Sequence, residues 1–262
     1  MGSFLFVGKG SAQGTPHLSP PKLAPHKHKE HKEHKGHKGH KGHKEHKGHK
    51  EQARHKDHKH HHTQLHHSFD NPEFWFKRFN APERQNWQNP KAIVDALNLK
   101  PHYTVVDLGA GTGYFLPYLQ EKIGSKGRIL ALDIGPKLIE FLHKRVREAK
   151  WSQVEPRLIK PNDPELLPHS IDCILIVNTW HHLPQTSEYL LKLKRSLKAN
   201  GQLVIVDFKK SSPKGPPKKH KVSQKQLIST LKNEGFKVEV HHLGLSDQYM
   251  VSGTQLSSLN PR

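Results

Sequence analysis

Between positions 107 and 113 an acid is followed by three alternate glycines: Asp107, Gly109, Gly111 and Gly113. Glycine allows a tight turn and lets the backbone approach a ligand where a Cβ atom would clash. The spacing differs from the G-x-G-x-x-G of dinucleotide sites and from the phosphate-binding G-x-x-x-x-G-K loop. A carboxylate at this point would repel a pyrophosphate but would attract a positively charged ligand. The stretch therefore predicts a nucleotide-type site for a cationic cofactor.

Two further polar residues follow apolar segments in the same way. Asp133 comes after the apolar segment 129–132, about 20 residues beyond the glycines, where an acid accepts hydrogen bonds from ribose hydroxyls in nucleotide-binding folds. Asn178 follows the continuous apolar run 171–177. Because ligands bind at the carboxyl ends of parallel strands, we expect these side chains at one edge of a sheet.

A pair of histidines, His181 and His182, lies three residues beyond Asn178. Either imidazole could act as a general base that takes a proton from a hydroxyl or an amine. The pair could equally be structural and pack at the start of the following helix. Both interpretations stay open, because group transfer by in-line displacement can depend largely on positioning and desolvation.

The elements that would hold these residues alternate regularly after residue 103. Apolar runs with β-branched residues predict strands, and apolar positions at a period of 3.6 predict helices. We expect strands at 104–108, 128–133, 154–159, 171–177, 202–208, 237–242 and 248–252, and helices at 114–123, 136–149, 186–197 and 223–234. The last two strands have no helix between them, which predicts an antiparallel hairpin.

This order predicts an α/β fold: a doubly wound, mostly parallel seven-stranded sheet with an antiparallel closing hairpin. Ahead of it, residues 69–97 predict a helical N-terminal cap, with Asn71 capping a first helix and Asn89-Pro90 starting another. Phe74, Trp75 and Phe79 would form an apolar face. We expect these rings to seal the core, with substrate contact as the alternative.

Composition divides the chain into a tail, residues 1–68, and a domain, residues 69–262. The formal net charge is +20, and basic surfaces attract anionic partners without identifying them. The single cysteine, Cys173, excludes an internal disulfide framework and a cysteine-based zinc site. Apolar runs stay shorter than the roughly 20 residues that a membrane helix needs. We expect a cytoplasmic protein, with export from a shortened signal peptide as the alternative; the oligomeric state is not predicted.

From residue 28 to 51 a His-Lys-Glu or His-Lys-Gly triplet repeats eight times. Such a segment has no apolar surface to offset its ordering entropy, so we expect the tail to be disordered. In an extended helix with three residues per turn the repeated histidines would line one edge and could chelate zinc, nickel or copper. These candidate metal ligands are His28, His31, His34, His37, His40, His43, His46 and His49.

Residues 107–113, Asp-Leu-Gly-Ala-Gly-Thr-Gly, resemble the first motif of the class I S-adenosylmethionine-dependent methyltransferases, and Leu132-Asp133-Ile134 is similar to their second-strand motif. Residues 162–168 resemble the loop whose acid faces the adenine amine, and residues 174–183 the fourth-strand motif. Within the class, the chain is most similar to methyltransferase-domain proteins near the ubiquinone/menaquinone C-methyltransferase type. A subgroup that shares residues 80–84 and the Trp-His-His segment is nearer still. The resemblance covers residues 69–253.

The resemblance implies S-adenosylmethionine as the cofactor and methyl transfer as the reaction. It places the following residues at the cofactor: Asp107, Gly109, Ala110, Gly111, Gly113, Asp133, Ile134, Asp163 and Asn178. Candidate groups on the substrate side are Tyr114, Trp180, His220 and Tyr249.

The methyl acceptor is expected to be a small molecule. The basic loop 209–221 could receive an anionic substrate or could be a solvated flexible loop. A metal-binding protein that uses the folded domain as an anchor or sensor is the main alternative. Methylation of RNA is less favoured, because no recognisable RNA-binding module is present.

Overall fold

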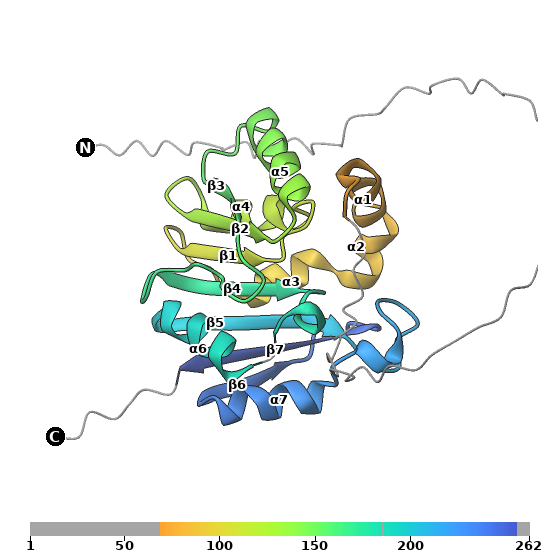
Figure 1. Cartoon of the computed structure of the whole chain (residues 1–262), viewed down its shortest axis with the longest axis vertical. Helices are drawn as coiled ribbons and strands as arrows, with labels where there is room; N and C mark the ends of the chain where they lie inside the picture. The colour runs from red at the N-terminus through yellow and green to blue at the C-terminus, as the bar shows by residue number, and fades with distance from the viewer. Residues whose placement is uncertain (1–68, 185, 256–262) are drawn as a thin grey trace, which may run out of the picture. The chain divides into compact units, whose positions relative to one another are not determined.

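The computed structural model describes residues 69–184 and 186–255. The His-rich tail, its candidate metal ligands and the tail–domain boundary near residue 68 lie outside these ranges. The described part holds a seven-stranded sheet of order β3-β2-β1-β4-β5-β7-β6 (Figure 1). The strands are β1 Thr104–Leu108, β2 Arg128–Asp133, β3 Val154–Leu158, β4 Ile171–Val177, β5 Leu197–Phe208, β6 Phe236–His241 and β7 Gln248–Gln255. The predicted doubly wound sheet is confirmed.

Pairing in the sheet follows the predicted topology. Strands β3, β2, β1, β4 and β5 pair in parallel, and β7 pairs antiparallel with both β5 and β6. The carboxyl ends of β1, β2, β4 and β5 therefore meet at one edge. This edge carries Asp107, Asp133, Asn178 and Asp207, each within one residue of the end of its strand.

Helices cover both faces of the sheet. They are α3 Pro90–Ala96, α4 Leu116–Ile123 and α5 Pro136–Glu148 on one face, and α6 Ser187–Ser196 and α7 Gln224–Asn233 on the other. Val105 packs with the first group and Val106 with the second, as the alternation of side chains along a strand requires. Helix α7 begins with a capping box between Ser223 and Gln226, which confirms Ser223 as its cap.

Several boundaries differ from those expected. Helix α4 begins at Leu116, two residues late, because residues 111–115 complete the glycine turn. Strand β5 begins at Leu197, since Leu197 pairs with Ile171 ahead of a register shift, and β7 extends to Gln255. Polar residues around such irregularities interrupt the apolar pattern, so the pattern does not predict where the strand ends.

The helical cap forms as α1 Pro72–Phe79, α2 Glu83–Gln88 and α3, with Asn71 and Asn89 as caps. The expectation that the aromatics of α1 seal the core is wrong. Helix α1 has no buried residue, and Phe74 is 53% exposed. The rings of Trp75 and Phe79 pack on each other at 5.2 Å between centroids, and the core is closed by α3 through Ile93 and Val94.

Candidate functional site

The glycine turn after β1 is tied to the end of β2 by main-chain hydrogen bonds. The backbone N–H groups of Gly109 and Ala110 donate to the carbonyl of Leu132 at 2.8 and 3.0 Å. The N–H of Gly111 donates to Oδ2 of Asp133 at 2.9 Å. All three glycines of the turn have positive φ, where residues with a Cβ atom are strained. The turn is thus a preformed cradle at the carboxyl edge of the sheet.

The three glycines differ in what surrounds them. A Cβ atom on Gly109 would lie 2.3 Å from the Thr179 side chain, and one on Gly113 would lie 2.6 Å from Leu116. At Gly111 the added carbon would meet nothing within 4 Å. Packing requires the outer two glycines, whereas the middle one faces open space that a ligand can fill.

Two buried acids lie at the strand ends that hold this turn, and Asp133 contacts Gly111 directly. Asp107 is fully buried, and desolvation, followed by repulsion from Asp133, raises the pKa of its carboxyl to about 7. Burial also raises the pKa of Asp133, although N–H groups of Gly135 and Gly111 stabilise its ionised form. Two buried carboxylates side by side favour a cationic ligand, because such a charge offsets both desolvation and repulsion.

Arg84 of α2 places a guanidinium over the glycine turn. It stacks on the Tyr114 ring at 3.9 Å, and its charge lowers the pKa of Asp107. Its Nε donates to Gln88 at 2.5 Å and one terminal nitrogen donates to the Phe79 carbonyl at 2.9 Å. Desolvation lowers the pKa of Arg84 to about 10, so it keeps its charge at neutral pH.

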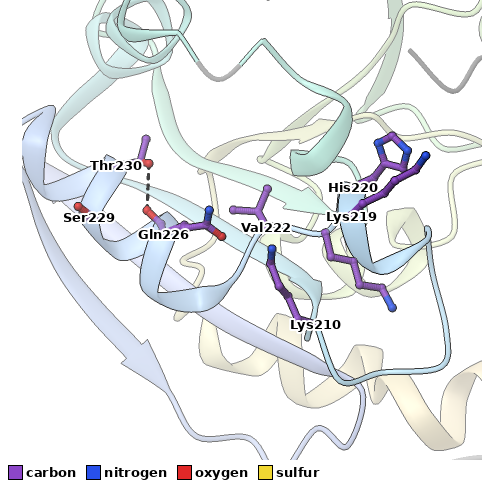
Figure 2. A pocket seen from close by; sticks show the side chains of 8 residues that line it. Lys210, Lys219, His220, Val222, Gln226, Ser229 and Thr230 are labelled. Atoms are coloured by element: carbon purple, nitrogen blue, oxygen red, sulfur yellow. Dashed lines mark hydrogen bonds between the residues drawn. The ribbon is translucent and has the colours of Figure 1, made fainter. Parts of the chain in front are cut away.

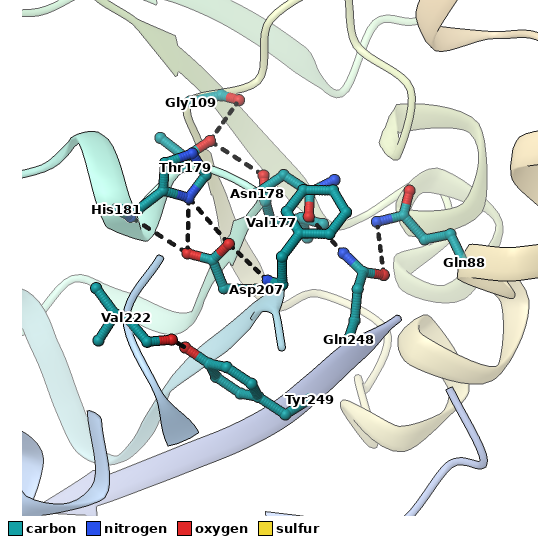
Figure 3. A network of polar contacts seen from close by, with 11 residues as sticks. Gln88, Gly109, Val177, Asn178, Thr179, His181, Asp207, Val222, Gln248 and Tyr249 are labelled. Atoms are coloured by element: carbon teal, nitrogen blue, oxygen red, sulfur yellow. Dashed lines mark hydrogen bonds and ion pairs between the residues drawn. The ribbon is translucent and has the colours of Figure 1, made fainter. Parts of the chain in front are cut away.

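A histidine–aspartate pair occupies the same edge, between the ends of β4 and β5 (Figure 3). His181, in the single turn η1 Trp180–His182, places Nδ1 at 2.9 Å from Oδ1 of Asp207. Its backbone N–H donates to the other oxygen of Asp207 at 3.2 Å. The Asp207 side chain is 2% exposed and that of His181 4%. A carboxylate only accepts hydrogen bonds, so the tautomer of His181 that carries its proton on Nδ1 satisfies this contact and leaves Nε2 as the proton acceptor.

Asn178 is held by a chain of amides that starts in the helical cap (Figure 3). The side chain of Gln88 donates to Gln248 at 3.1 Å, and Gln248 donates to Oδ1 of Asn178. Asn178 itself has a φ of 56°, a conformation that asparagine tolerates better than most residues. The network connects α2, β7 and the end of β4, and so fixes the cap against the carboxyl edge of the sheet.

Comparison with known proteins agrees with this geometry. The model of the family described as "Methyltransferase domain" matches residues 99–253, more than half of the chain. The chain belongs to the methyltransferase domain family. A solved S-adenosylmethionine-dependent methyltransferase from Aquifex aeolicus superposes with a TM-score of 0.65 at 29% identity, over 70% of this chain and 97% of that one. The fold is thus that of the class I methyltransferases.

Curated relatives share parts of the chain. The ubiquinone/menaquinone biosynthesis C-methyltransferase UbiE of Wigglesworthia glossinidia brevipalpis is 25% identical over 47% of this chain and 49% of its own length. A ribosomal RNA large subunit methyltransferase E of Stenotrophomonas maltophilia is 51% identical over 23% of this chain and 31% of its own. The chain spans between about a third and a half of these curated relatives.

The remaining predicted cofactor residues lie at the same edge or near it. Ile134, directly after Asp133, exposes 55% of its surface, which suits a residue that covers a flat apolar ligand group. Asp163 accepts the N–H of Glu165 and an ion pair from Lys192, and these contacts lower its pKa. Asp163 is therefore ionised, although part of its hydrogen-bonding capacity is already used.

The predicted substrate-side residues do not form one group. Tyr114 lies under Arg84 beside the glycine turn. Trp180 is 1% exposed and belongs to the core cluster between the sheet and α6. Tyr249 is buried too, and its hydroxyl donates to the Val222 carbonyl at 3.0 Å. His220 lines a separate basic cavity.

Three residues of the site were not assigned a role from the sequence: Asp207, Arg84 and Arg145. A terminal nitrogen of Arg145 donates to the carbonyls of Thr112 and Gly113 at 2.6 and 2.7 Å and clamps the glycine turn. Asp207 follows the apolar run 203–206 as Asp107 and Asp133 follow theirs, and Arg84 belongs to the shared segment 80–84, but neither signal gave the residue a role.

Metal-ligand clusters of three or more suitable side chains are absent from residues 69–184 and 186–255. Within the same residues there is also no helix with the length and apolar character to cross a bilayer. The triplet histidines fall outside this part of the chain, so their role as metal ligands stays a prediction.

Proposed function

We propose that the chain binds S-adenosylmethionine at the glycine turn and transfers its methyl group to a small-molecule acceptor. The observation that carries this proposal is the open space at Gly111 beside Asp133, whose buried carboxylate accepts the Gly111 N–H and interacts electrostatically with that of Asp107. A ligand with a positive amino group and a positive sulfonium suits this pair of acids, and a pyrophosphate would be repelled. Membership of the methyltransferase domain family and the likeness to the Aquifex aeolicus enzyme support the same cofactor.

Each part of the cofactor has a candidate partner in the chain. The backbone of Gly109, Ala110, Gly111 and Gly113 would face the methionine part, and Asp107 would attract its amino group. The second terminal nitrogen of Arg84 makes no hydrogen bond within residues 69–184 and 186–255 and would pair with the methionine carboxylate. Asp133 has lone pairs left for ribose hydroxyls, and Ile134 and Asp163 would lie at the adenine.

When bound, the cofactor would supply an electrophilic methyl group on its sulfonium, with a neutral thioether as the leaving group. The chain's own contribution is proton removal and orientation. Nε2 of His181 takes a proton from the acceptor hydroxyl, amine or acidic C–H group as that atom bonds to the methyl carbon. Asp207 holds the Nδ1 proton, orients the ring and stabilises the imidazolium that forms. Asn178 and His182 lie next to this pair; the ring of His182 is exposed and centred 4.2 Å from that of His181.

Incubation of cell extract with methyl-labelled cofactor and the full chain tests the proposal. Label should pass to a compound of low molecular mass, and a His181→Ala variant that still binds the cofactor should transfer it far more slowly. Absence of transfer to any extract fraction by a cofactor-loaded protein would contradict the proposal.

Methylation of RNA is the second candidate, favoured by the local match to a ribosomal RNA methyltransferase and by the charge of +20. Label in high-molecular-mass RNA, together with steeply salt-dependent RNA binding, would favour it over a small acceptor.

Metal binding by the triplet histidines, and the cytoplasmic location expected above, stay predictions. A zinc or nickel titration of the full chain, compared with a chain in which the eight triplet histidines are glutamine, tests the former. Metal uptake by the first chain and not by the second is the expected result.

A further inference from the structure

A cavity of about 420 Å³ lies between the basic loop and α7 (Figure 2). Lys210, Lys219 and His220 line it on the loop side, and Gln226, Ser229 and Thr230 line it on the helix side. Its volume lies within the range typical of small-molecule sites. No acidic side chain is among the residues that line it, so the cavity offers positive charge and neutral hydrogen-bonding groups to whatever enters.

The lysines of this loop fall into two sets. Lys209 donates to the Leu245 carbonyl at 2.6 Å, Lys214 pairs with Asp247 at 2.7 Å, and Lys221 donates to the Ser212 carbonyl at 2.6 Å. These contacts fasten the loop to the segment between β6 and β7 and to itself. The alternative of a flexible solvated loop therefore does not describe this segment, which is anchored.

The second set faces the cavity. Within residues 69–184 and 186–255, Lys210, Lys219 and His220 have no carboxylate within ion-pair distance and no side-chain hydrogen bond. Like charges that are gathered in a concave surface without counter-charges create a positive potential there. The anchored lysines hold the loop in this conformation. Repulsion among the cations that line the cavity is unfavourable, and an anionic ligand would offset it.

The loop that lines the cavity continues from the strand that carries Asp207. It follows directly on Asp207 and Phe208 at the end of β5, and Gly215 of the loop lies against the Phe208 ring, where a Cβ atom would come within 2.3 Å. Val222, in the cavity wall, accepts the hydroxyl hydrogen bond of Tyr249, which pairs with Asp207 in the sheet (Figure 3). One segment thus connects the cavity wall to the proposed catalytic pair.

We propose that this cavity binds an oxyanion, a phosphate or a carboxylate group, of the small-molecule methyl acceptor. Lys210 and Lys219 supply the charge, and the side chains of Gln226 and Ser229 on α7 supply further hydrogen-bond donors, since Thr230 already donates its hydroxyl to the Gln226 carbonyl. The identification of the ligand as the methyl acceptor rests on the proposed methyl transfer. The anion site itself rests only on the cavity and its unpaired cations.

The test uses the full chain and two probes, inorganic phosphate and citrate, at low salt. Backbone amide resonances of residues 222–230 are followed by NMR, because they report the cavity and not the His-rich tail. A Lys210→Gln/Lys219→Gln variant is compared with Lys232→Gln/Lys237→Gln, which removes the same charge from exposed positions on α7 and β6. We expect saturable shifts with at least one probe, weakened at least tenfold in the first variant and less than twofold in the second.

Equal weakening in both variants, or no saturable shift with either probe, would overturn the inference. Binding of RNA at the cavity would also overturn it. An RNA oligonucleotide would then shift the same resonances and displace the probes, with a salt dependence that corresponds to contacts with several phosphates. The relative response to phosphate and citrate distinguishes a phosphorylated from a carboxylated acceptor. Binding of S-adenosylmethionine is measured separately by calorimetry. If the full chain binds an anion probe but does not bind S-adenosylmethionine, the proposed function is contradicted and the anion site is not.

Discussion

Nδ1 of His181 lies 2.9 Å from Oδ1 of Asp207, and the backbone N–H of the same histidine donates to the second oxygen of that carboxylate. Ring and main chain of one residue are thus held by a single buried acid. The two residues come from different segments, the turn η1 and the end of β5, which meet because β4 and β5 pair in parallel. The pair fixes the tautomer of His181 and directs its other nitrogen away from Asp207.

The first prediction concerns this tautomer and its use. Nitrogen-15 NMR of the neutral ring should find the proton of His181 on Nδ1. His181→Ala should lower kcat by on the order of 100- to 10,000-fold, the usual contribution of a positioned base, with little change in cofactor affinity. The matched control is His182→Ala, which removes the exposed neighbouring ring. Equal losses in the two variants, or an Nε2 proton on His181, would mean that the ring is structural.

The second prediction is a pH dependence of cofactor binding. Asp107 has a pKa near 7 without ligand, so below pH 7 a cationic ligand must displace a proton from it. Affinity for S-adenosylmethionine should fall by up to about tenfold per pH unit below 7 and should decline again above about pH 8, where an α-amino group loses its charge. Calorimetry between pH 5.5 and 8.5 measures this. Asp107→Asn should remove the acidic limb; an unchanged affinity of the wild type between pH 5.5 and 7 would refute the assignment.

The third prediction concerns stability without ligand. The pKa of Asp107 is raised by folding, so its favourable contribution is complete below about pH 4 and is lost as the pH rises to 7. Asp107→Asn should therefore increase the free energy of unfolding at pH 8 by roughly 1–4 kcal/mol and should change it little at pH 4. Urea denaturation at the two pH values checks this. An equal increase in the free energy of unfolding at pH 4 and pH 8 would mean that the substitution acts through packing and not through charge.

The fourth prediction concerns Arg84. Replacement by methionine keeps much of the apolar contact with Tyr114 but removes the proposed partner of the methionine carboxylate. Affinity for S-adenosylmethionine should fall at least tenfold, in line with the loss of a charge-assisted hydrogen bond. The exposed Arg78 of α1 provides the control: Arg78→Met removes the same charge without contact to the glycine turn, and affinity should stay within twofold. A decarboxylated cofactor analogue should bind wild type and Arg84→Met alike.

Local patterns predicted the part of this site that is formed by consecutive residues. The acid and glycines of residues 107–113 lie on one strand and its turn, and Asp133 follows its strand in the same way, so period and spacing suffice. The role of Asp207 was not predicted, although this residue also lies near the end of a strand. That role depends on a contact with His181, which is 26 residues away in the chain. The role of Arg84 was not predicted, because no sequence pattern indicates which helix of the cap lies next to the glycine turn.

Burial was the other property that the sequence did not disclose. Trp180 and Tyr249 were candidates for the substrate side, and in the structure both lie in the core. The lysines of residues 209–221 read as one charge run, yet packing separates Lys214, paired with Asp247, from Lys210 and Lys219, which face a cavity. Each of these distinctions depends on contacts between segments far apart in the chain.

The most direct test of the cofactor site compares two glycines by calorimetry with S-adenosylmethionine. Gly111 and Gly124 both have positive φ and open space at the Cβ position, but Gly111 lies in the turn after β1 and Gly124 ends α4. Arginine at either position adds the same charge at a residue of positive φ. Gly124, with φ 63° and ψ −168°, has a conformation that only glycine adopts readily, so its replacement is a stringent control for backbone strain. The account predicts that Gly124→Arg binds the cofactor like the wild type and that Gly111→Arg, folded by circular dichroism, does not. Wild-type affinity in Gly111→Arg, or no binding by the wild type itself, would contradict it.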